Sequence, residues 1–337
     1  MKNILISILL IGSYHINAQD WNLVWSDEFN YSGLPDTTKW VNEVGFIRNN
    51  ELQYYTYRRL ENSKVENGTL LIIGRKESYN GANYTSASLT TDGKYAWAYG
   101  KIEARIKLPD GQGMWPAFWL LGENIHQVGW PKCGEVDIME HINNENMNHG
   151  TMHWDNNGHV SYGGTIDCDV QQYHIYSIEW DDQTIAWLLD GNKYLEGNIK
   201  DSINNTGAFH HPFYMILNLA IGGSWPGSPD STTSFPDTMF VDYVRVYQKS
   251  TNTNAEILDV NDIKIFPIPA KDFVTIEIPQ LKRKSSVTIT DLFGKEILTR
   301  QINGKNIQIK LGGLSNGVYI LKYSNEFTNL TKKIVKN

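Results

Sequence analysis

Three carboxylates, Glu135, Asp137 and Glu140, fall within six residues of one short segment, and apolar residues separate them. Side chains of a β-strand alternate between its two faces, so Glu135 and Asp137 would share one face and Glu140 would point to the other. A one-residue β-bulge near Ile138 and Met139 would return Glu140 to the first face. We therefore expect a bulged strand that carries the three acids in a row.

A row of three acids is suited to the cleavage of a glycosidic bond. Carboxylates a few ångströms apart raise each other's pKa and cannot all ionise freely, so the arrangement offers little to a purely structural protein. Glycoside hydrolysis uses it, because one carboxylate attacks as nucleophile while a protonated carboxylic acid donates to the leaving oxygen. Taken alone, the spacing also fits an exposed acidic strand face or a metal site. The neighbouring residues therefore have to distinguish a glycosidase site from an exposed acidic face or a metal site.

Tryptophans flank the acidic segment. Trp115 and Trp119 lie four residues apart in a glycine-rich stretch just before it, and Trp130 follows them. Indole faces stack on the apolar faces of pyranose rings, so aromatic residues beside paired acids indicate a sugar-binding cleft. These neighbours favour the glycosidase interpretation over the other two.

Two motifs resemble glycoside hydrolase family 16, close to its laminarinase (endo-β-1,3-glucanase) branch. They are G-Q-G-M-W-P-A-F-W-L-L-G at 111–122 and G-E-V-D-I-M-E-H-I-N at 134–143, and the resemblance extends over 21–248. The family's active-site strand occurs with and without one extra residue, and this chain has the longer, bulged form that is typical of laminarinases. The resemblance implies an endo-acting, retaining hydrolase, with Glu135 as nucleophile and Glu140 as general acid and base.

The resemblance also implies roles for the remaining site residues. Asp137, between the two glutamates, is expected to keep their charge and protonation apart through a shared hydrogen bond. Substrate contacts are expected from a loop similar to the family's N-N-E-x-Q-Y-Y segment, from an arginine that leaves an apolar strand, from a histidine near the nucleophile and from three tryptophans. These residues are Asn50, Glu51, Arg75, Trp115, Trp119, His153 and Trp225.

Several of these residues have an ordinary structural alternative. The segment around Asn50 could be a plain polar loop, Arg75 could be solvated or salt-bridged, and His153 could be a packed, hydrogen-bonded histidine. Trp225 lies in N-L-A-I-G-G-S-W-P-G, which is similar to a family segment. His149 lies on the strand expected for His153 and receives no role from the sequence.

The strand pattern predicts an all-β fold. Many short apolar or alternating segments are separated by turn signals, and almost no stretch has the 3.6-residue period of a helix. Residues 100–109 alternate almost without fault, with Ile102, Ala104, Ile106 and Leu108 expected inward. The resemblance makes this fold a β-jelly-roll sandwich of the concanavalin-like type, with a concave catalytic face.

Members of family 16 often hold a calcium ion on the convex side of the sandwich. The matching positions in this chain are Glu28, Gly68 and Asp242. Oxygen ligands suit Ca²⁺, so a structural calcium is an expectation that comes from the resemblance alone. No organic cofactor is expected, because hydrolysis requires only water.

The net charge of −7 is unevenly distributed. Residues 262–337 contain 13 Lys and Arg against 6 Asp and Glu, a charge of +7, and the remainder contains 17 against 31, a charge of −14. Such asymmetry indicates two units of different origin. An acidic main unit argues against nucleic acid as a ligand.

The chain divides into four predicted parts. Residues 1–18 have the pattern of a secretory signal peptide, because a short basic start precedes an apolar run that is too short for a membrane span. Residues 20–248 form the catalytic domain, 249–261 a polar linker, and 262–337 a small C-terminal β-sandwich domain. No other segment is long and apolar enough to suggest a transmembrane helix.

The C-terminal part resembles the sorting domain of the type IX secretion system of Bacteroidetes. It has a P-x-P start, with F-P-I-P at 266–269 where Y-P-N-P is usual, a D-x-x-G turn at Asp291, a G-V-Y strand at Gly317 and a basic end. The expected partner of this domain is the secretion machinery, and the expected location is outside the cell or attached to its surface. We expect the protein to be a monomer.

Cys133 and Cys168 are the only cysteines, so the fold does not depend on a disulfide framework. In a secreted chain these two could form one bridge, and the sequence leaves this open. Neither cysteine has the spacing of a zinc site.

The sequence thus predicts a secreted hydrolase that cleaves β-1,3 linkages in a laminarin-like glucan, with mixed-linkage β-1,3-1,4-glucan as a further candidate. Three alternatives stay open: hydrolysis of another glycan on the same fold (lichenan, agarose or carrageenan), transglycosylation, and non-catalytic β-glucan binding. The last is disfavoured, because such binding proteins generally lack the two glutamates. Substrate specificity depends on loops whose geometry the sequence does not display.

Overall fold

The computed structural model describes residues 21–249, 263–278, 285–292, 294–302, 304, 306–324 and 329–337. The predicted signal peptide and almost all of the predicted linker lie outside these residues. The chain divides into two compact units between residues 250 and 251. This division falls inside the predicted linker.

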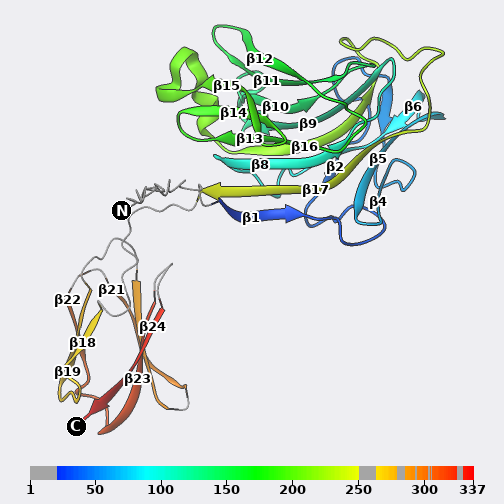
Figure 1. The fold of residues 1–337 in the computed structure, drawn as a ribbon. Helices are drawn as coiled ribbons and strands as arrows, with labels where there is room; N and C mark the ends of the chain where they lie inside the picture. Colours follow the sequence, from blue (N-terminus) through cyan, green and yellow to red (C-terminus); the bar gives the residue numbers. More distant parts are fainter. Residues whose placement is uncertain are drawn as a thin grey trace, which may run out of the picture. The chain divides into compact units, whose positions relative to one another are not determined.

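The first unit is a sandwich of two largely antiparallel sheets (Figure 1). The strands of one sheet are β1 Trp21–Asp27, β3 Gln53–Tyr55, β4 Ser63–Glu66, β5 Thr69–Tyr79, β6 Ala82–Ser86, β8 Gly100–Lys107, β13 His174–Trp180, β14 Thr184–Leu189, β15 Asn192–Asn198 and β17 Asp237–Lys249. The order in this ten-stranded sheet is β15-β14-β13-β8-β17-β5-β6-β3, with β1 paired to β17 and β4 paired to β5.

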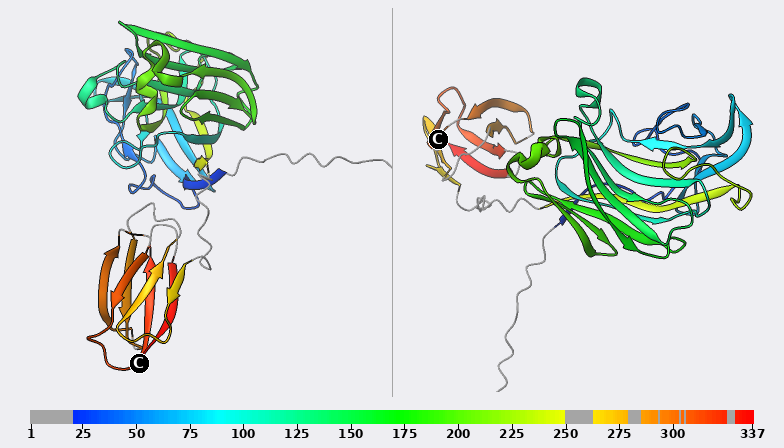
Figure 2. Two further views of the ribbon diagram at one scale, coloured as in Figure 1. Left: turned by 90° about the vertical axis from the view of Figure 1, so that its left-hand side faces the viewer. Right: turned by 90° about the horizontal axis from the view of Figure 1, so that it is seen from above.

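The second sheet of this unit has seven strands and carries the acidic segment. Its strands are β2 Val41–Asn42, β7 Ser88–Thr90, β9 Met114–Gly122, β10 Glu135–Glu140, β11 Met147–Asp155, β12 His159–Asp167 and β16 Phe213–Ile221. Their order is β12-β11-β10-β9-β16-β7-β2. Figure 2 shows from two further sides that the strands of both sheets are curved. The predicted jelly-roll sandwich is confirmed.

Two short helical segments accompany the sheets, a helix α1 at Ile125–Val128 and a run of 3-10 turns at Lys200–His210. Phe209 in the second segment is fully buried, and its carbonyl oxygen accepts a hydrogen bond from Trp180 Nε1 at 3.1 Å. The turns therefore cover one part of the core.

The core lies between the two sheets and follows the alternation of the strands. Ile102 and Ile106 of β8 are fully buried, as predicted. Strand β9 is buried on both faces: Phe118 packs in the core between the sheets, whereas Trp119 belongs to a separate cluster on the opposite face. At β9, packed side chains therefore line the opposite face of the seven-stranded sheet as well.

A β-bulge interrupts β10 at the predicted place. The register with β9 shifts between Asp137 and Met139, and the register with β11 shifts between Asp137 and Glu140. Ile138 and Met139 both pack in the core. Glu140 therefore returns to the face that carries Glu135 and Asp137, and the predicted bulge is confirmed.

The second unit consists of two smaller sheets around a core of its own. The three-stranded sheet has the order β18-β19-β22 and the four-stranded sheet the order β21-β20-β23-β24. Apolar side chains from both sheets, such as Ile276, Ile289 and Leu321, form one buried cluster. The strands are β18 Lys264–Phe266, β19 Phe273–Glu277, β20 Ser285–Thr290, β21 Glu296–Ile302, β22 Asn306–Lys310, β23 Gly317–Ser324 and β24 Asn329–Lys336.

Both cysteines are free thiols. Cys133 is buried beside β10, and Cys168 is half-buried and packs against the core. The sequence allowed a disulfide between Cys133 and Cys168, and the structure does not contain it. In the part of the chain that the structure describes, no helix has the length and apolar character needed to cross a membrane.

The ten-stranded sheet holds the bulged strand through one buried hydrogen bond. Trp187 of β14 is fully buried, and its Nε1 donates to the main-chain oxygen of Asp137 at 2.7 Å. A bulge breaks the regular ladder, so carbonyl groups near it need partners from elsewhere.

We expect Trp187→Phe to lower the free energy of unfolding by about 1–3 kcal/mol, because it removes the buried donor and leaves the Asp137 carbonyl without it. Urea denaturation of the whole protein measures this change. Trp225, which is 41% exposed, provides the control. Trp225→Phe should change the free energy of unfolding by less than about 0.5 kcal/mol, and equal losses in both variants would contradict the expectation.

Candidate active site

A cavity of about 640 Å³ lies on the face of the seven-stranded sheet that points away from the core. It contains all three acids and five of the seven predicted substrate-binding residues. The lining residues are Arg48, Asn49, Glu51, Trp115, Ala117, Trp119, Leu121, Ile125, Trp130, Glu135, Asp137, Glu140, Thr151, His153, His159, Asn218 and Trp225.

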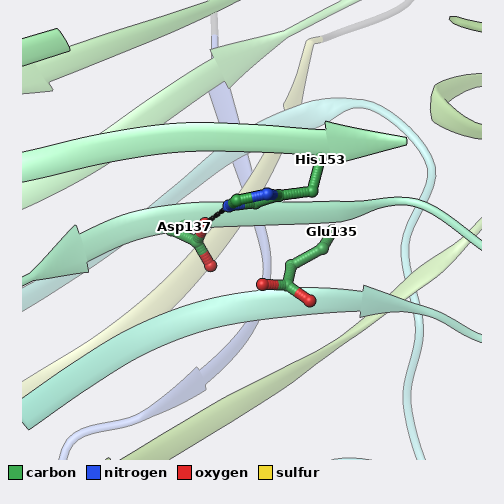
Figure 3. Close-up of side chains that lie close together, drawn as sticks. All are labelled: Glu135, Asp137 and His153. Atoms are coloured by element: carbon green, nitrogen blue, oxygen red, sulfur yellow. Dashed lines mark ion pairs between the residues drawn. The ribbon is translucent and has the colours of Figure 1, made fainter. Parts of the chain in front are cut away.

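Strand β10 runs along the floor of this cavity between β9 and β11. Glu135 pairs in register with His153 of β11, and Asp137 pairs with Trp119 of β9. Figure 3 shows the side chains of Glu135, Asp137 and His153 close together, with the His153 ring beside the Asp137 carboxylate. The strand register therefore converts a sequence spacing into one cluster of side chains.

Each acid has its own nitrogen partner. Trp130 Nε1 donates to Glu135 Oε2 at 2.8 Å, and Trp115 Nε1 donates to Glu140 Oε1 at 2.9 Å. Nε2 of His153 lies 3.1 Å from Oδ2 of Asp137. These three partners fix the orientation of the carboxyl groups and leave other oxygen atoms of the glutamates available.

The three carboxyl groups have raised pKa values. Burial disfavours their charged forms and is the main cause of the raised pKa in each case. The negative charge of Asp137 raises the pKa of Glu135 and of Glu140 further. The three groups therefore bind protons as a coupled set and cannot all be ionised together. A protonated carboxylic acid beside an ionised carboxylate is the pair that glycoside hydrolysis requires.

Glu51 is buried at the cavity wall and belongs to a polar network. Its Oε2 accepts hydrogen bonds from Gln53 Nε2 at 2.6 Å and from Tyr55 OH at 3.1 Å. Tyr55 OH accepts from Asn218, and Asn218 Oδ1 accepts from Trp119 Nε1 at 2.7 Å. Burial raises the pKa of Glu51. The network therefore connects Glu51 with Asn218 of β16 and with Trp119 of β9.

Trp225 reaches the cavity from the loop after β16 and is the more exposed of the predicted tryptophans. Its ring makes edge contacts with Trp115, at a centroid distance of 5.6 Å, and with His149, at 5.0 Å. His149 Nε2 is held by Glu145 Oε2 at 2.8 Å. His149, which had no role from the sequence, therefore packs against a candidate sugar-binding tryptophan.

His159 at the start of β12 was not predicted as a site residue. Its Nε2 lies 2.9 Å from Nδ1 of His153, and its ring lies 4.6 Å from the ring of Trp130. It therefore touches the partners of both Asp137 and Glu135. The sequence holds no signal for this contact, because it depends on the β11–β12 hairpin.

Two predicted substrate-binding residues do not line the cavity. Arg75 lies on β5 of the other sheet, with its Nε 3.6 Å from Glu77 Oε1, which corresponds to the salt-bridged alternative. Asn50 is exposed at the rim, and its neighbour Asn49 lines the cavity. The cation that lines the cavity is Arg48. Sugar contacts of Arg75 and Asn50 remain predictions without support from this geometry.

Asn218 was also missed, although the sequence contains a signal for it. It is the single polar residue in the apolar strand β16, Phe-Tyr-Met-Ile-Leu-Asn-Leu-Ala-Ile, and it is buried. A buried polar side chain in such a strand requires hydrogen-bond partners. Arg48 gave a weaker signal, since it directly precedes the recognised polar loop.

For the acid cluster, the sequence analysis also offered a metal site as an alternative interpretation. Among the described residues, ligand atoms of Glu135, Asp137 and His153 lie within 4.8 Å of one another. Protons held by the two carboxyl groups, whose pKa values are raised by burial, would compete with a metal ion. The donors described above make the cluster better suited to proton transfer than to metal binding.

The predicted calcium ligands lie near one another by strand register. Asp27, next to Glu28, pairs with Val244 of β17, and Val241 of β17 pairs with Leu70, which follows Gly68 by two residues. Carboxylate and main-chain oxygen atoms suit Ca²⁺. The carboxylate of Glu28, however, forms two hydrogen bonds with Arg245, at 2.7 and 2.9 Å.

Asp242, the other acidic residue of this set, pairs with Arg105 at 2.8 Å. Both carboxylates are therefore neutralised by arginines. The oxygen chemistry fits calcium, but an ion would have to share or displace these two partners.

Comparison with known proteins agrees with this geometry. The model of the glycosyl hydrolases family 16 matches residues 50–245, and the model of the secretion system C-terminal sorting domain matches residues 264–337. The chain is 41% identical over 265 residues to a beta-glucanase of Rhodothermus marinus, covering 74% of this chain and 93% of the relative.

A solved structure and a longer protein are also similar. The catalytic domain of an endo-1,3-beta-glucanase (laminarinase) from Thermotoga petrophila superposes with a TM-score of 0.64 at 44% identity, covering 69% of this chain and 99% of that chain. The clotting factor G alpha subunit of Tachypleus tridentatus is 42% identical, but the match covers only 35% of its length. The match to the sorting domain indicates that the protein is secreted or attached to the cell surface. The chain as a whole belongs to the glycosyl hydrolases of family 16.

Proposed function

We propose that this protein is an endo-acting, retaining β-glucan hydrolase that cleaves β-1,3 linkages. The observation that carries the proposal is the bulged strand β10, which places two glutamates and one aspartate on the floor of one cavity. The names of two relatives that are covered almost in full, a beta-glucanase and a laminarinase, support the substrate class. Laminarin-like glucan is therefore the proposed substrate, with mixed-linkage β-glucan as the second candidate.

In the proposed reaction Glu135 attacks the anomeric carbon while Glu140 protonates the leaving glycosidic oxygen. The bond to the leaving sugar breaks and a covalent glycosyl-enzyme forms. Glu140 then takes a proton from water, whose oxygen attacks the anomeric carbon and releases Glu135. The hydrogen bonds from Trp130 and Trp115 hold the two glutamates in place for these steps.

Asp137 is the proposed regulator of charge between the two glutamates. It is only 2% exposed, and its negative charge raises the pKa of Glu140, which keeps the general acid protonated. Nε2 of His153 lies 3.1 Å from Oδ2 of Asp137 and holds this carboxyl group in place. The charge of Asp137 thus favours the protonated form of Glu140, the form that donates to the leaving oxygen.

The alternatives differ in what they require of the same cavity. A non-catalytic glucan-binding protein has no need for three buried acids with raised pKa values, which are unfavourable for stability. Transglycosylation and the hydrolysis of lichenan, agarose or carrageenan share the proposed chemistry and differ only in the acceptor or the glycan. Product analysis separates these alternatives.

A structural calcium at Glu28, Gly68 and Asp242 and a monomeric state are further parts of the proposal. Calcium is supported by the oxygen ligands and by the strand register, and it is opposed by the two arginine pairs. Catalysis itself requires neither calcium nor an organic cofactor.

Wild-type protein should release short laminari-oligosaccharides from laminarin, and Glu135→Ser should lower this activity on the order of 10⁴-fold or more, because serine cannot replace the carboxylate nucleophile. Chromatography of products from laminarin, mixed-linkage β-glucan and agarose provides the measurement. Glu66→Ser, at the exposed end of strand β4, is the control and should keep full activity. Activity on agarose alone would contradict the substrate, and no activity with retained binding would contradict the enzyme proposal.

Asp137→Asn should move the alkaline limb of the kcat/KM profile to lower pH. Glu140 has to be protonated to act as general acid, so kcat/KM falls as pH rises through its pKa. The charge of Asp137 raises that pKa, and the asparagine removes the charge while it keeps the size. Asp230→Asn, in an exposed loop, should leave the profile unchanged. An alkaline limb that stays in place or moves to higher pH would show that Asp137 does not act in this way.

If calcium binds at the proposed site, Ca²⁺ at about 100 times its Kd should raise the melting temperature of EDTA-treated protein by roughly 5–10 °C. Differential scanning calorimetry with Ca²⁺ and with Mg²⁺ measures the effect, and Asp242→Asn should weaken it. An identical melting temperature with and without millimolar Ca²⁺ would rule the structural calcium out.

A further inference from the structure

His159, at the start of strand β12, lines the cavity and has no role in the mechanism above. Ser161 pairs in register with His153 of β11, and His159 precedes Ser161 by two residues, so it lies on the same strand face. His159 is therefore a diagonal neighbour of His153 on the cavity side of the sheet. The register of β11 with β12 runs without a shift, so His159 is carried by a regular part of the sheet.

The rings of His153 and His159 meet edge to edge. Nδ1 of His153 lies 2.9 Å from Nε2 of His159, and the two ring planes differ by only 19°. The ring centroids lie 5.1 Å apart, which matches this N–N distance plus the distance from each nitrogen to the centre of its own ring. The hydrogen bond therefore lies in the plane of both rings and leaves the faces of the His159 ring available for other contacts.

The ring of Trp130 uses this possibility. Its centroid lies 4.6 Å from that of His159, with an angle of 43° between the planes. A centroid distance this short requires contact through a ring face, because two rings that met edge to edge would lie farther apart. The ring of His153 is more distant from Trp130, at 6.4 Å. His159 is therefore the nearer of the two imidazoles that support the indole.

Trp130 requires such support because it is an exposed side chain. It lies in the loop between α1 and β10, is 48% exposed, and donates from Nε1 to Glu135 Oε2 at 2.8 Å. Both side chains have rotatable bonds, so a hydrogen bond between them fixes only their position relative to each other. The imidazole of His159, which is carried by a regular hairpin, supplies the external reference.

We propose that His159 is a positioning residue that holds the indole of Trp130 in the orientation from which Nε1 donates to the nucleophile Glu135. This inference rests on the proposed function and adds a residue to the same site. His159 acts through Trp130 and not on the sugar. The bond to His153 keeps the imidazole in the plane in which its face meets the indole.

The hydrogen bond from Trp130 affects the protonation of Glu135 as well as its position. Burial and the charge of Asp137 raise the pKa of Glu135, whereas His153 and the hydrogen bond from Trp130 lower it. Loss of this bond therefore raises the pKa further. Glu135 has to be ionised to attack, so kcat/KM falls as pH decreases through its pKa, and a higher pKa moves this acidic limb to higher pH.

The experiment compares two full-length variants, each of which keeps one of the two contacts. His159→Phe keeps a ring beside Trp130, and His159→Gln keeps an amide beside His153 but has no ring. We expect His159→Gln to lower kcat/KM on laminari-oligosaccharides roughly 10-fold and to move the acidic limb to higher pH, because the nucleophile loses its fixed donor. His159→Phe should stay within about 3-fold of wild type, with the limb in place. His159→Asn serves if His159→Gln fails to fold.

A substrate with a dinitrophenolate leaving group isolates the attack by Glu135. This group leaves as the stable anion and needs no proton from Glu140, so kcat/KM on a dinitrophenyl β-laminaribioside reports the formation of the bond between Glu135 and the anomeric carbon. We expect His159→Gln to lower this value by a factor similar to that on oligosaccharides. An effect on oligosaccharides alone would place the defect at Glu140 and overturn the proposal.

Binding separates positioning from direct contact with the sugar. In Glu135→Ser protein the positioned carboxylate is absent, so adding His159→Gln should leave the Kd of laminari-oligosaccharides unchanged in isothermal titration calorimetry. A raised Kd would show that His159 binds the sugar itself and would overturn the positioning role.

His211, an exposed histidine that does not line the cavity, provides the matched control. His211→Gln should leave kcat/KM and the pH profile unchanged, and melting temperatures show whether each variant folds. The other charged groups that act on Glu135, those of Asp137, His153 and Arg48, are present in every His159 variant. Movement of the acidic limb therefore does not arise from their loss.

Two further results would overturn the proposal and leave the proposed function intact. A folded His159→Gln variant with the kcat/KM and acidic limb of wild type would show that Trp130 needs no support from His159. A His159→Phe variant as impaired as His159→Gln would show that the bond to His153 matters instead of the ring contact. In both cases the wild type stays active, whereas a wild type that is inactive on every β-glucan would contradict the proposed function itself.

Discussion

The rest of the active site depends on one irregularity, the extra residue in strand β10. A regular strand would place Glu140 in the core and Met139 in the cavity, and a charged group in the core would be strongly unfavourable. The bulge puts Ile138 and Met139 into the core together and returns Glu140 to the cavity. The buried indole of Trp187 supplies a donor to the main chain at this point. The packing of the two sheets and the chemistry of the cavity are thus satisfied by the same backbone distortion.

A second constraint is that three acids on one strand face repel one another and lose hydration. The structure offsets this with a separate nitrogen partner for each acid: Trp130, His153 and Trp115. Two of the three partners are neutral indoles, which donate hydrogen bonds to a carboxylate without adding a full positive charge. A lysine or arginine in the same place would lower the pKa of the general acid and deprive it of its proton. The neutral indole of Trp115 therefore leaves the pKa of Glu140 raised, as general-acid catalysis requires.

Much of this arrangement could be predicted from the sequence, because it depends on local periodicity. The acids, the bulge and the inward face of β8 follow from counting residues along single strands. The failures have another origin: Arg48, His159 and Asn218 enter the site through contacts between segments distant in the chain. Arg75 was selected because the matching arginine of family 16 reaches the sugar cleft, but its strand β5 belongs to the other sheet. Sequence patterns define the faces of a strand, whereas sheet order and loop paths decide which faces meet.

The tryptophans show how a residue type can be identified correctly while its contribution differs from the expectation. Trp115 and Trp119 line the cavity but are only 9% and 7% exposed, and their indole nitrogens are bonded to Glu140 and Asn218. Such rings present edges and N–H groups more than open faces, and Arg48 already covers Trp119. Trp225, at 41% exposed, has the larger free surface for a pyranose ring. We therefore expect stacking on a sugar ring at Trp225 rather than at Trp115 or Trp119, whose indole nitrogens are engaged in hydrogen bonds.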